Sequence, residues 1–138
     1  MMKIKRINHV AVAVDDIDRV AAKWREVFGV ELEGREIVAS QQVETVMLPF
    51  ANIAVELVSP RGNEGVQRFL DKRGPGLHHV AIEVEGIEDA IAFLKALNVP
   101  IVDQVPRIGA HGHKVAFLHP KATGGVLVEL VELVESDG

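Results

Sequence analysis

Two histidines and two glutamates occupy matching positions in two halves of this 138-residue sequence. Two segments seventy positions apart align without a gap, and this alignment places His79 on His9. Further along, the tetrapeptide Val-Glu-Leu-Val occurs twice, so that Glu56 corresponds to Glu129. A repeated side chain at one fixed place indicates a shared role. The aligned histidine segments are Ile7–Val14 and Leu77–Val84.

The four repeated residues carry the donor atoms of a divalent metal site. Glu56 and Glu129 interrupt otherwise apolar segments, and a buried carboxylate without a partner is strongly destabilising. Two imidazoles and two carboxylates suit Co, Ni, Mn, Zn or Fe. In octahedral geometry two positions remain for water or substrate, and such an ion can stabilise an enolate as a Lewis acid. Two separate structural His–Glu pairs without a metal are the alternative.

The neighbouring histidine, His78, receives a different interpretation. It aligns with Asn8, and the alternation of a strand sends it to the face opposite His79. We therefore expect His78 to lie on the surface or behind the metal ligands.

Each half of the sequence predicts a strand, a helix and three further strands. Alternating valines followed by apolar residues at helical spacing support the strand and the helix at the start of each half. We expect an α+β fold of two tandem βαβββ modules, forming a curved, mostly antiparallel sheet with the helices on its outer face. The predicted strands are 7–14, 31–39, 43–48, 53–58, 77–84, 101–105, 114–118 and 126–134, and the predicted helices are 18–28, 64–72 and 89–97.

The length fits one domain spanning residues 1–138. Module 1 covers about residues 5–60, a linker with a helix covers 61–76, and module 2 covers about 77–135. The small-residue face of each first strand, which carries His9 or His79, would point into the concavity of the sheet.

Composition excludes several classes of function. The net charge is −5, and no basic tract indicates binding to nucleic acid. No apolar run reaches the length of a membrane span, and no signal peptide is evident. The absence of cysteine excludes thiolate metal sites and fits a cytoplasmic location.

Several segments together resemble the vicinal oxygen chelate superfamily, which includes glyoxalases and extradiol dioxygenases, and within it the methylmalonyl-CoA epimerases. The resemblance covers nearly the whole chain, and the loop and turn of the second half are its most specific parts. The segments are Ile7–Val14, Gly76–His79, Arg107–Gly112, Phe117–Lys121 and Gly124–Leu130.

The resemblance implies that His9, His79 and Glu129 are metal ligands and that Glu56 occupies a fourth ligand position, which is a glutamine in some members. It implies one divalent metal per chain, with Co(II) favoured and Mn, Ni or Zn possible, and a homodimer. The implied reaction exchanges (R)- and (S)-methylmalonyl-CoA. A base removes the proton between the thioester and the carboxylate, and Glu129 is one candidate for this base.

A second proton-transfer group is harder to assign. Some family members place a glutamate on the strand that corresponds to residues 43–48. The ungapped match puts Thr45 there, with Glu44 one residue away. Because a one-residue shift reverses the face of a strand, Glu44 is either a catalytic base or a solvent-facing residue.

The loop after Pro106 is the expected binding segment for the acyl-CoA substrate. Its amides and side chains could hold the substrate carboxylate or coenzyme A phosphates, although a mixed solvated surface would look the same in sequence. The residues predicted to bind substrate are Arg107, Gly109, Ala110, His111 and Gly112.

Two other functions use the same scaffold. One is another metal enzyme, either a glyoxalase I-like lyase or a dioxygenase with two histidines and one carboxylate on iron, which would leave Glu56 idle. The other is a metal-free protein that sequesters a small molecule and so confers resistance. The presence of all four ligand-type residues argues against this second function.

Overall fold

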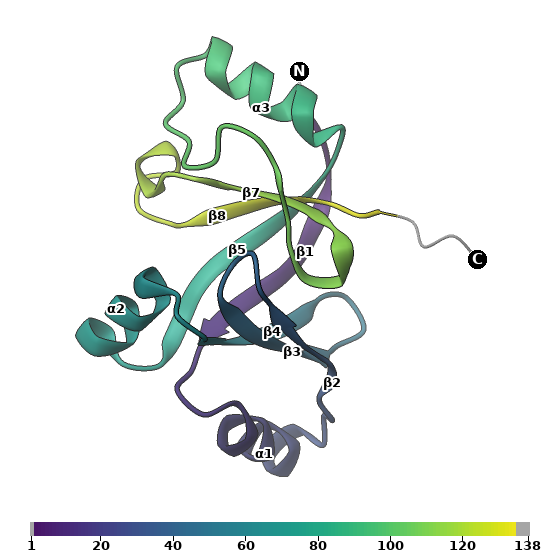
Figure 1. Ribbon diagram of the computed structural model, residues 1–138. Coiled ribbons are helices and arrows are strands. Elements are labelled where there is room, and N and C mark those ends of the chain that lie inside the picture. The colour runs from purple at the N-terminus through teal and green to yellow at the C-terminus, as the bar shows by residue number, and fades with distance from the viewer. Residues whose placement is uncertain (1, 135–138) are drawn as a thin grey trace. The chain divides into compact units, whose positions relative to one another are not determined.

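The computed structural model describes residues 2–134, and each half of the chain contains a strand, a helix and three further strands (Figure 1). The first half consists of β1 (Lys3–Ala13), α1 (Ile17–Phe28), β2 (Glu33–Val38), β3 (Val43–Pro49) and β4 (Ala54–Pro60). The helix α2 (Glu64–Arg73) connects the halves. The second half consists of β5 (Gly76–Glu85), α3 (Ile87–Ala96), β6 (Arg107–Ile108), β7 (Lys114–Leu118) and β8 (Val128–Glu132).

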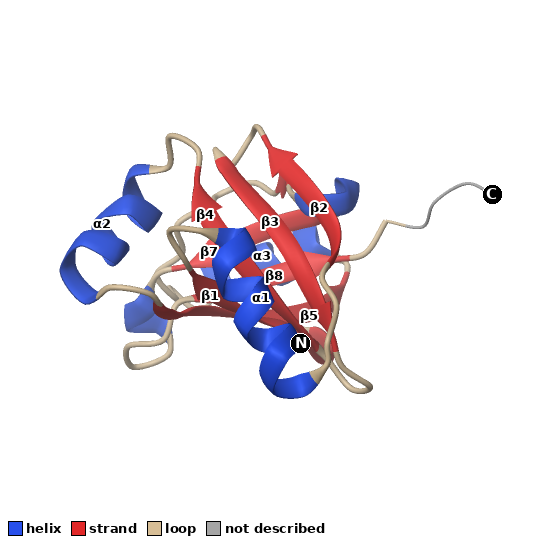
Figure 2. Cartoon of the chain, turned by 90° about the horizontal axis from the view of Figure 1, so that it is seen from below, coloured by secondary structure: helices blue, strands red, loops and turns tan. Residues whose placement is uncertain are grey.

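The chain forms two compact units whose borders cross the strands β1 and β5. The early unit contains residues 9–78, and the late unit combines the residues up to Asn8 with those from His79 onward. The strand order is β2-β3-β4-β1 in the early unit and β1-β5-β8-β7-β6 in the late unit. β1 pairs with β4 and β5 pairs with β8 in parallel, whereas β2, β3, β6 and β7 pair antiparallel with their neighbours (Figure 2). The α+β class and the two βαβββ modules are therefore confirmed.

The core of the early unit lies between α1 and one face of its strands. Asp16 caps α1 by accepting a hydrogen bond from the backbone N–H of Arg19, and Gly29 ends the helix with φ of 71°. Val14 and side chains from α1, β3 and β4 form a buried cluster. The histidine face of β1 is thus left to His9 and small residues. The cluster consists of Val14, Ile17, Ala21, Val46, Leu48 and Leu57.

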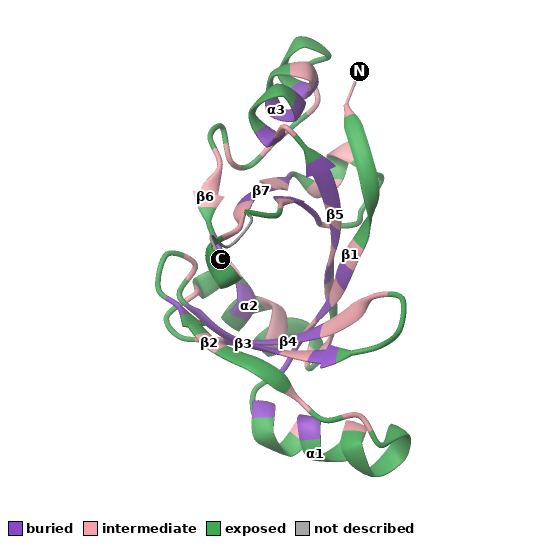
Figure 3. Cartoon of the chain, turned by 90° about the vertical axis from the view of Figure 1, so that its right-hand side faces the viewer, coloured by how far each residue is buried: buried purple, intermediate pink, exposed green. Residues whose placement is uncertain are grey.

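The core of the late unit has the same plan with α3 as its cover. Ile87, Ala90, Ile91 and Leu94 of α3 are buried and pack against β5, β7 and β8. Figure 3 colours the buried parts of this helix purple. The first turn of α3 is fixed by Glu132, whose carboxylate accepts hydrogen bonds from the N–H groups of Gly86 at 2.6 Å and Ile87 at 3.3 Å. A carboxylate is stabilised there because the helix N-terminus carries partial positive charge.

One predicted strand, residues 101–105, was wrong. Only Ile101 forms an isolated bridge, with Leu118, and the second strand of this half is the short β6 further along. The carboxylate of Asp103 accepts a hydrogen bond from the N–H of Phe117 at 2.8 Å. The N–H groups of Val102 and Asp103 donate to the carbonyl of Phe117. The segment is therefore joined to β7 partly through a side chain, and no continuous strand forms.

Within residues 2–134, every helix is too short or too polar to span a bilayer.

Replacing Leu48 by alanine should lower the free energy of unfolding by about 2–5 kcal/mol, because this fully buried residue would leave a cavity. Urea unfolding followed by circular dichroism measures the change. Leu97→Ala is the matched control, since Leu97 is 58% exposed, and its effect should stay within about 0.5 kcal/mol. Equal losses in the two variants would contradict the assigned core.

Candidate metal and active site

The parallel strand pairs give each unit the same arrangement of histidine and glutamate. In the early unit Ala11 lies opposite Glu56, and in the late unit Ala81 lies opposite Glu129. Each histidine stands two residues before its alanine and therefore shares a face with it. The sequence repeat is thus also a repeat of strand register.

Distances and burial within each unit fit metal donors. His9 Nε2 lies 3.8 Å from a carboxylate oxygen of Glu56, and His79 Nε2 lies 3.8 Å from one of Glu129. All four residues are buried. The separation exceeds that of a hydrogen bond but matches two ligands of one ion, which lie about 3–4 Å apart when each is about 2.1 Å from it.

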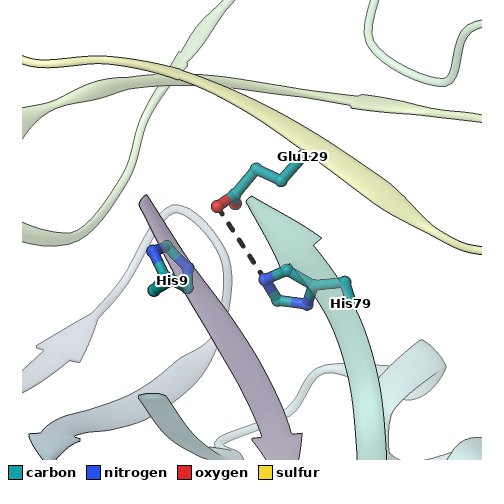
Figure 4. Close-up of side chains that lie close together, drawn as sticks. All are labelled: His9, His79 and Glu129. Atoms are coloured by element: carbon teal, nitrogen blue, oxygen red, sulfur yellow. Dashed lines mark ion pairs between the residues drawn. The ribbon is translucent and has the colours of Figure 1, made fainter. Parts of the chain in front are cut away.

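Donor atoms of three of the predicted ligands lie close together. One donor atom from each of His9, His79 and Glu129 lies within 4.8 Å of the others, and Figure 4 shows these side chains with the His79–Glu129 ion pair. Two nitrogens and a carboxylate suit borderline divalent ions. This buried His-His-Glu cluster could bind one metal ion.

A chain of contacts connects His79 to the loop predicted to bind substrate. The ring of Phe117 packs edge-on against His79, with centroids 5.1 Å apart. Asp103 accepts a hydrogen bond from the N–H of Phe117 and forms an ion pair with Arg107 at 3.2 Å. Arg107 is therefore held by a residue that is itself fixed to β7.

The rest of this loop is a tight turn with unusual backbone geometry. The 3-10 turn Ala110–Gly112 has φ of 60° at His111 and 75° at Gly112. The N–H of Gly109 donates to the carbonyl of His113 at 2.8 Å and closes the turn. A left-handed histidine is costly, so the closing hydrogen bond must offset that cost.

Glu44 lies on the face of β3 opposite to that of the candidate metal ligands. Met47 is directly opposite Glu56, and Glu44 is directly opposite Ser59, so alternation separates Glu44 from Glu56. Arg61 donates a hydrogen bond to Glu44 at 2.7 Å and Arg35 donates another at 3.2 Å. The Arg61 hydrogen bond lowers the pKa of Glu44, burial opposes this, and Arg35 lowers it further. This geometry disfavours a catalytic role for Glu44 and indicates a structural one.

Sequence analysis overlooked a buried carboxylate on β5. Glu83 is 1% exposed and accepts hydrogen bonds from Arg6 at 3.0 Å and Asn8 at 3.2 Å, with Lys5 at 3.6 Å. Burial raises the pKa of Glu83, but the hydrogen bonds and the nearby positive charges lower it overall. The alternation His79, Ala81, Glu83 was the available signal in the sequence.

His78 lies apart from the candidate ligands, as predicted. Its ring packs edge-on against Phe69 of α2, with centroids 5.1 Å apart, and Arg73 stacks over the same Phe69 ring. Burial lowers the pKa of His78. This histidine contributes to packing of α2 in the early unit.

The fold and the paired histidines and glutamates are typical of a superfamily of metal-binding proteins. Comparison with known proteins gives the same superfamily. The family model described as Glyoxalase/Bleomycin resistance protein/Dioxygenase superfamily matches residues 8–117. More particularly, the chain belongs to the methylmalonyl-CoA epimerase family within that superfamily.

Three relatives carry this assignment. A mitochondrial methylmalonyl-CoA epimerase of Dictyostelium discoideum is 40% identical over 94% of this chain and 79% of its own length. An ethylmalonyl-CoA/methylmalonyl-CoA epimerase of Cereibacter sphaeroides is 38% identical over 94% of this chain and 99% of its own. The methylmalonyl-CoA epimerase of Streptomyces coelicolor, solved with 2-nitronate-propionyl-CoA, has a TM-score of 0.89 and 29% identity over 96% of this chain and 100% of its own.

The Glu44 network should stabilise the fold in a pH-dependent way. Because the folded pKa is below 4.5, the stabilisation is complete above that value and is lost as the pH falls through the folded pKa. Glu44→Gln should cost about 1 kcal/mol at pH 7, a small value because Arg35 and Arg61 are partly exposed.

Urea unfolding of both proteins at neutral and acidic pH measures this effect. The difference between wild type and Glu44→Gln should shrink as the pH falls below 4.5. Glu33→Gln, at an exposed position of β2, is the matched control and should change little at either pH. A Glu44→Gln cost that does not depend on pH would contradict the ionic role.

Proposed function

We propose that this protein is a divalent-metal-dependent epimerase that exchanges the (R) and (S) forms of methylmalonyl-CoA. The observation that carries the proposal is the matched, buried His–Glu pair on one face of each unit. The names of the relatives support the substrate, since two are methylmalonyl-CoA epimerases and one also acts on ethylmalonyl-CoA.

In this proposal His9, Glu56, His79 and Glu129 hold one divalent ion per chain. The ion, when bound, supplies Lewis-acid stabilisation of negative charge on substrate oxygens. The repeated register of the two His–Glu pairs supports Glu56 as the fourth ligand beside the three clustered residues. Burial of the four side chains excludes water and strengthens their hold on a charged ligand.

The protein's part in the reaction is proton transfer and orientation. The α-carbon lies between a thioester and a carboxylate, so its proton is acidic enough for a carboxylate base. Glu129 takes this proton, and a second group returns a proton to the opposite face of the resulting enolate, so that no net proton is gained or lost. Glu44 is not this second group, because its carboxylate is directed away from the Glu56 face and is held by two arginines.

The loop of the late unit binds the acyl-CoA substrate in this proposal. Arg107 supplies positive charge and its position is fixed through Asp103. Backbone amides and the side chain of His111 supply further polar contacts. The residues assigned to this role are Arg107, Gly109, Ala110, His111 and Gly112.

Co(II) as the favoured metal and the homodimer stay predictions of the family resemblance, and the cytoplasmic location stays a prediction from the absence of cysteine. Mn, Ni and Zn fit the same donor set.

Replacing His79 by asparagine should weaken Co(II) binding by at least about 100-fold, because it removes one nitrogen ligand. Isothermal titration of metal-stripped protein with CoCl2 measures the affinity. His78→Asn is the matched control: it changes the adjacent residue, which packs on Phe69, and should keep the wild-type affinity. Equal losses in both variants would remove His79 from the ligand set.

Wild-type protein with Co(II) should incorporate deuterium at the α-carbon of (R)- or (S)-methylmalonyl-CoA in D2O, as measured by NMR. Glu129→Gln should slow this exchange by about 10²- to 10⁴-fold, since the base is lost. Glu44→Gln, the same substitution on the other face of the sheet, should stay within about threefold of wild type. A protein that binds Co(II) but catalyses no exchange would have another reaction of the superfamily instead.

A further inference from the structure

The hydroxyl of Thr45 on β3 is buried without a partner. Thr45 is 2% exposed, and within residues 2–134 its Oγ1 atom has no hydrogen-bond partner. Folded proteins seldom leave a buried hydroxyl unsatisfied, because it has lost its bonds to water. A ligand is one source of the missing partner.

Strand register places this hydroxyl on the face that carries the candidate metal ligands. Thr45 is directly opposite Val58, and Met47 is directly opposite Glu56. Residues directly opposite each other share a face, and side chains two apart on one strand do so as well. Thr45 is therefore a diagonal neighbour of Glu56 on the same face of the early unit.

The repeat shows that the fold does not require a hydroxyl at this position. In the late unit, Phe117 is opposite Glu129 and Val115 is opposite Val131, so Val115 is the structural counterpart of Thr45. Val115 packs with Ala81 and Val131 in a buried apolar cluster. Threonine and valine have nearly the same shape, so the two units differ here by a hydroxyl in place of a methyl group.

We propose that Thr45 is a substrate-binding residue whose hydroxyl donates a hydrogen bond to a carboxylate oxygen of the malonyl-type acyl group. The inference rests on the proposed epimerase function. A neutral donor suits this role because a hydrogen bond to a charged acceptor is stronger than one between neutral groups. An aliphatic hydroxyl is too weak a base to take the α-proton, so Thr45 orients the substrate and proton transfer stays with a carboxylate.

The test compares Thr45→Val with Thr45→Ser in the full-length protein loaded with Co(II). The probe is 2-nitronate-propionyl-CoA, in which a negatively charged nitronate replaces the carboxylate, and its affinity is measured by isothermal titration. Thr45→Val should weaken binding by about 10- to 100-fold, the usual effect of losing a hydrogen bond to a charged group. Thr45→Ser keeps the donor and should stay within about threefold of wild type.

Thermal unfolding of the ligand-free variants separates binding from packing. Thr45→Val should melt at the wild-type temperature or above, because it removes an unsatisfied buried hydroxyl. Val115→Thr, the reverse exchange at the matching position, should melt lower.

Three outcomes would overturn the proposal. Wild type and Thr45→Val binding the probe equally well would refute the role of the hydroxyl while leaving the epimerase function intact. Thr45→Ser binding as weakly as Thr45→Val would assign the effect to packing. Wild type that neither binds the probe nor exchanges the α-proton would overturn the epimerase function and this inference together.

Discussion

The register of two parallel strand pairs is the constraint on which the candidate site depends. In each unit the first strand of the module pairs with its last strand, so that an alanine faces a glutamate and a histidine stands two residues earlier. A shift of one residue in either pair would move the glutamate to the helix-covered face. The apolar clusters beneath α1 and α3 prevent that shift, because they hold the alternate residues of the same strands in the core. Packing against the helices therefore determines which side chains lie on the opposite face.

Four buried glutamates show two different ways of compensating a carboxylate. Glu44 and Glu83 accept hydrogen bonds from arginine side chains, and these contacts lower the pKa of both carboxyls. Glu56 and Glu129 instead lie 3.8 Å from histidine nitrogens. Arginine is a permanent cation that cannot ligate a metal, whereas neutral imidazole is a common metal ligand. The division between carboxylates held by arginine and candidate metal ligands thus follows from the type of base beside each.

Much of this arrangement could be predicted from the sequence because the same pattern of residues occurs in both halves. Alternation and repetition predict the repeated His and Glu positions, the order of strand, helix and three strands, and the direction of His78 away from the face of His79. Contacts made by single side chains could not be predicted. The carboxylate of Asp103 accepts a hydrogen bond from the N–H of Phe117 where a strand over residues 101–105 was expected. Strand propensity does not encode such a contact. The pairing of Glu83 with Arg6 and Asn8 likewise joins residues about 75 positions apart.

Glu44 and Thr45 show why register decides function where composition cannot. Sequence matching left a choice between two adjacent residues, and the pairing of β3 with β4 resolves their faces: Glu44 is opposite Ser59 and Thr45 is opposite Val58. The carboxylate, which has the chemistry of a base, is held by arginines on the other face, while the Glu56 face receives a hydroxyl that can only donate or accept a hydrogen bond. The late unit has valine at the matching place. The two units are therefore alike in the ligands they offer to a metal and unlike in the polar group beside them. The substrate of the proposed function is itself asymmetric, with a thioester on one side of the α-carbon and a carboxylate on the other, and the single hydroxyl matches that asymmetry.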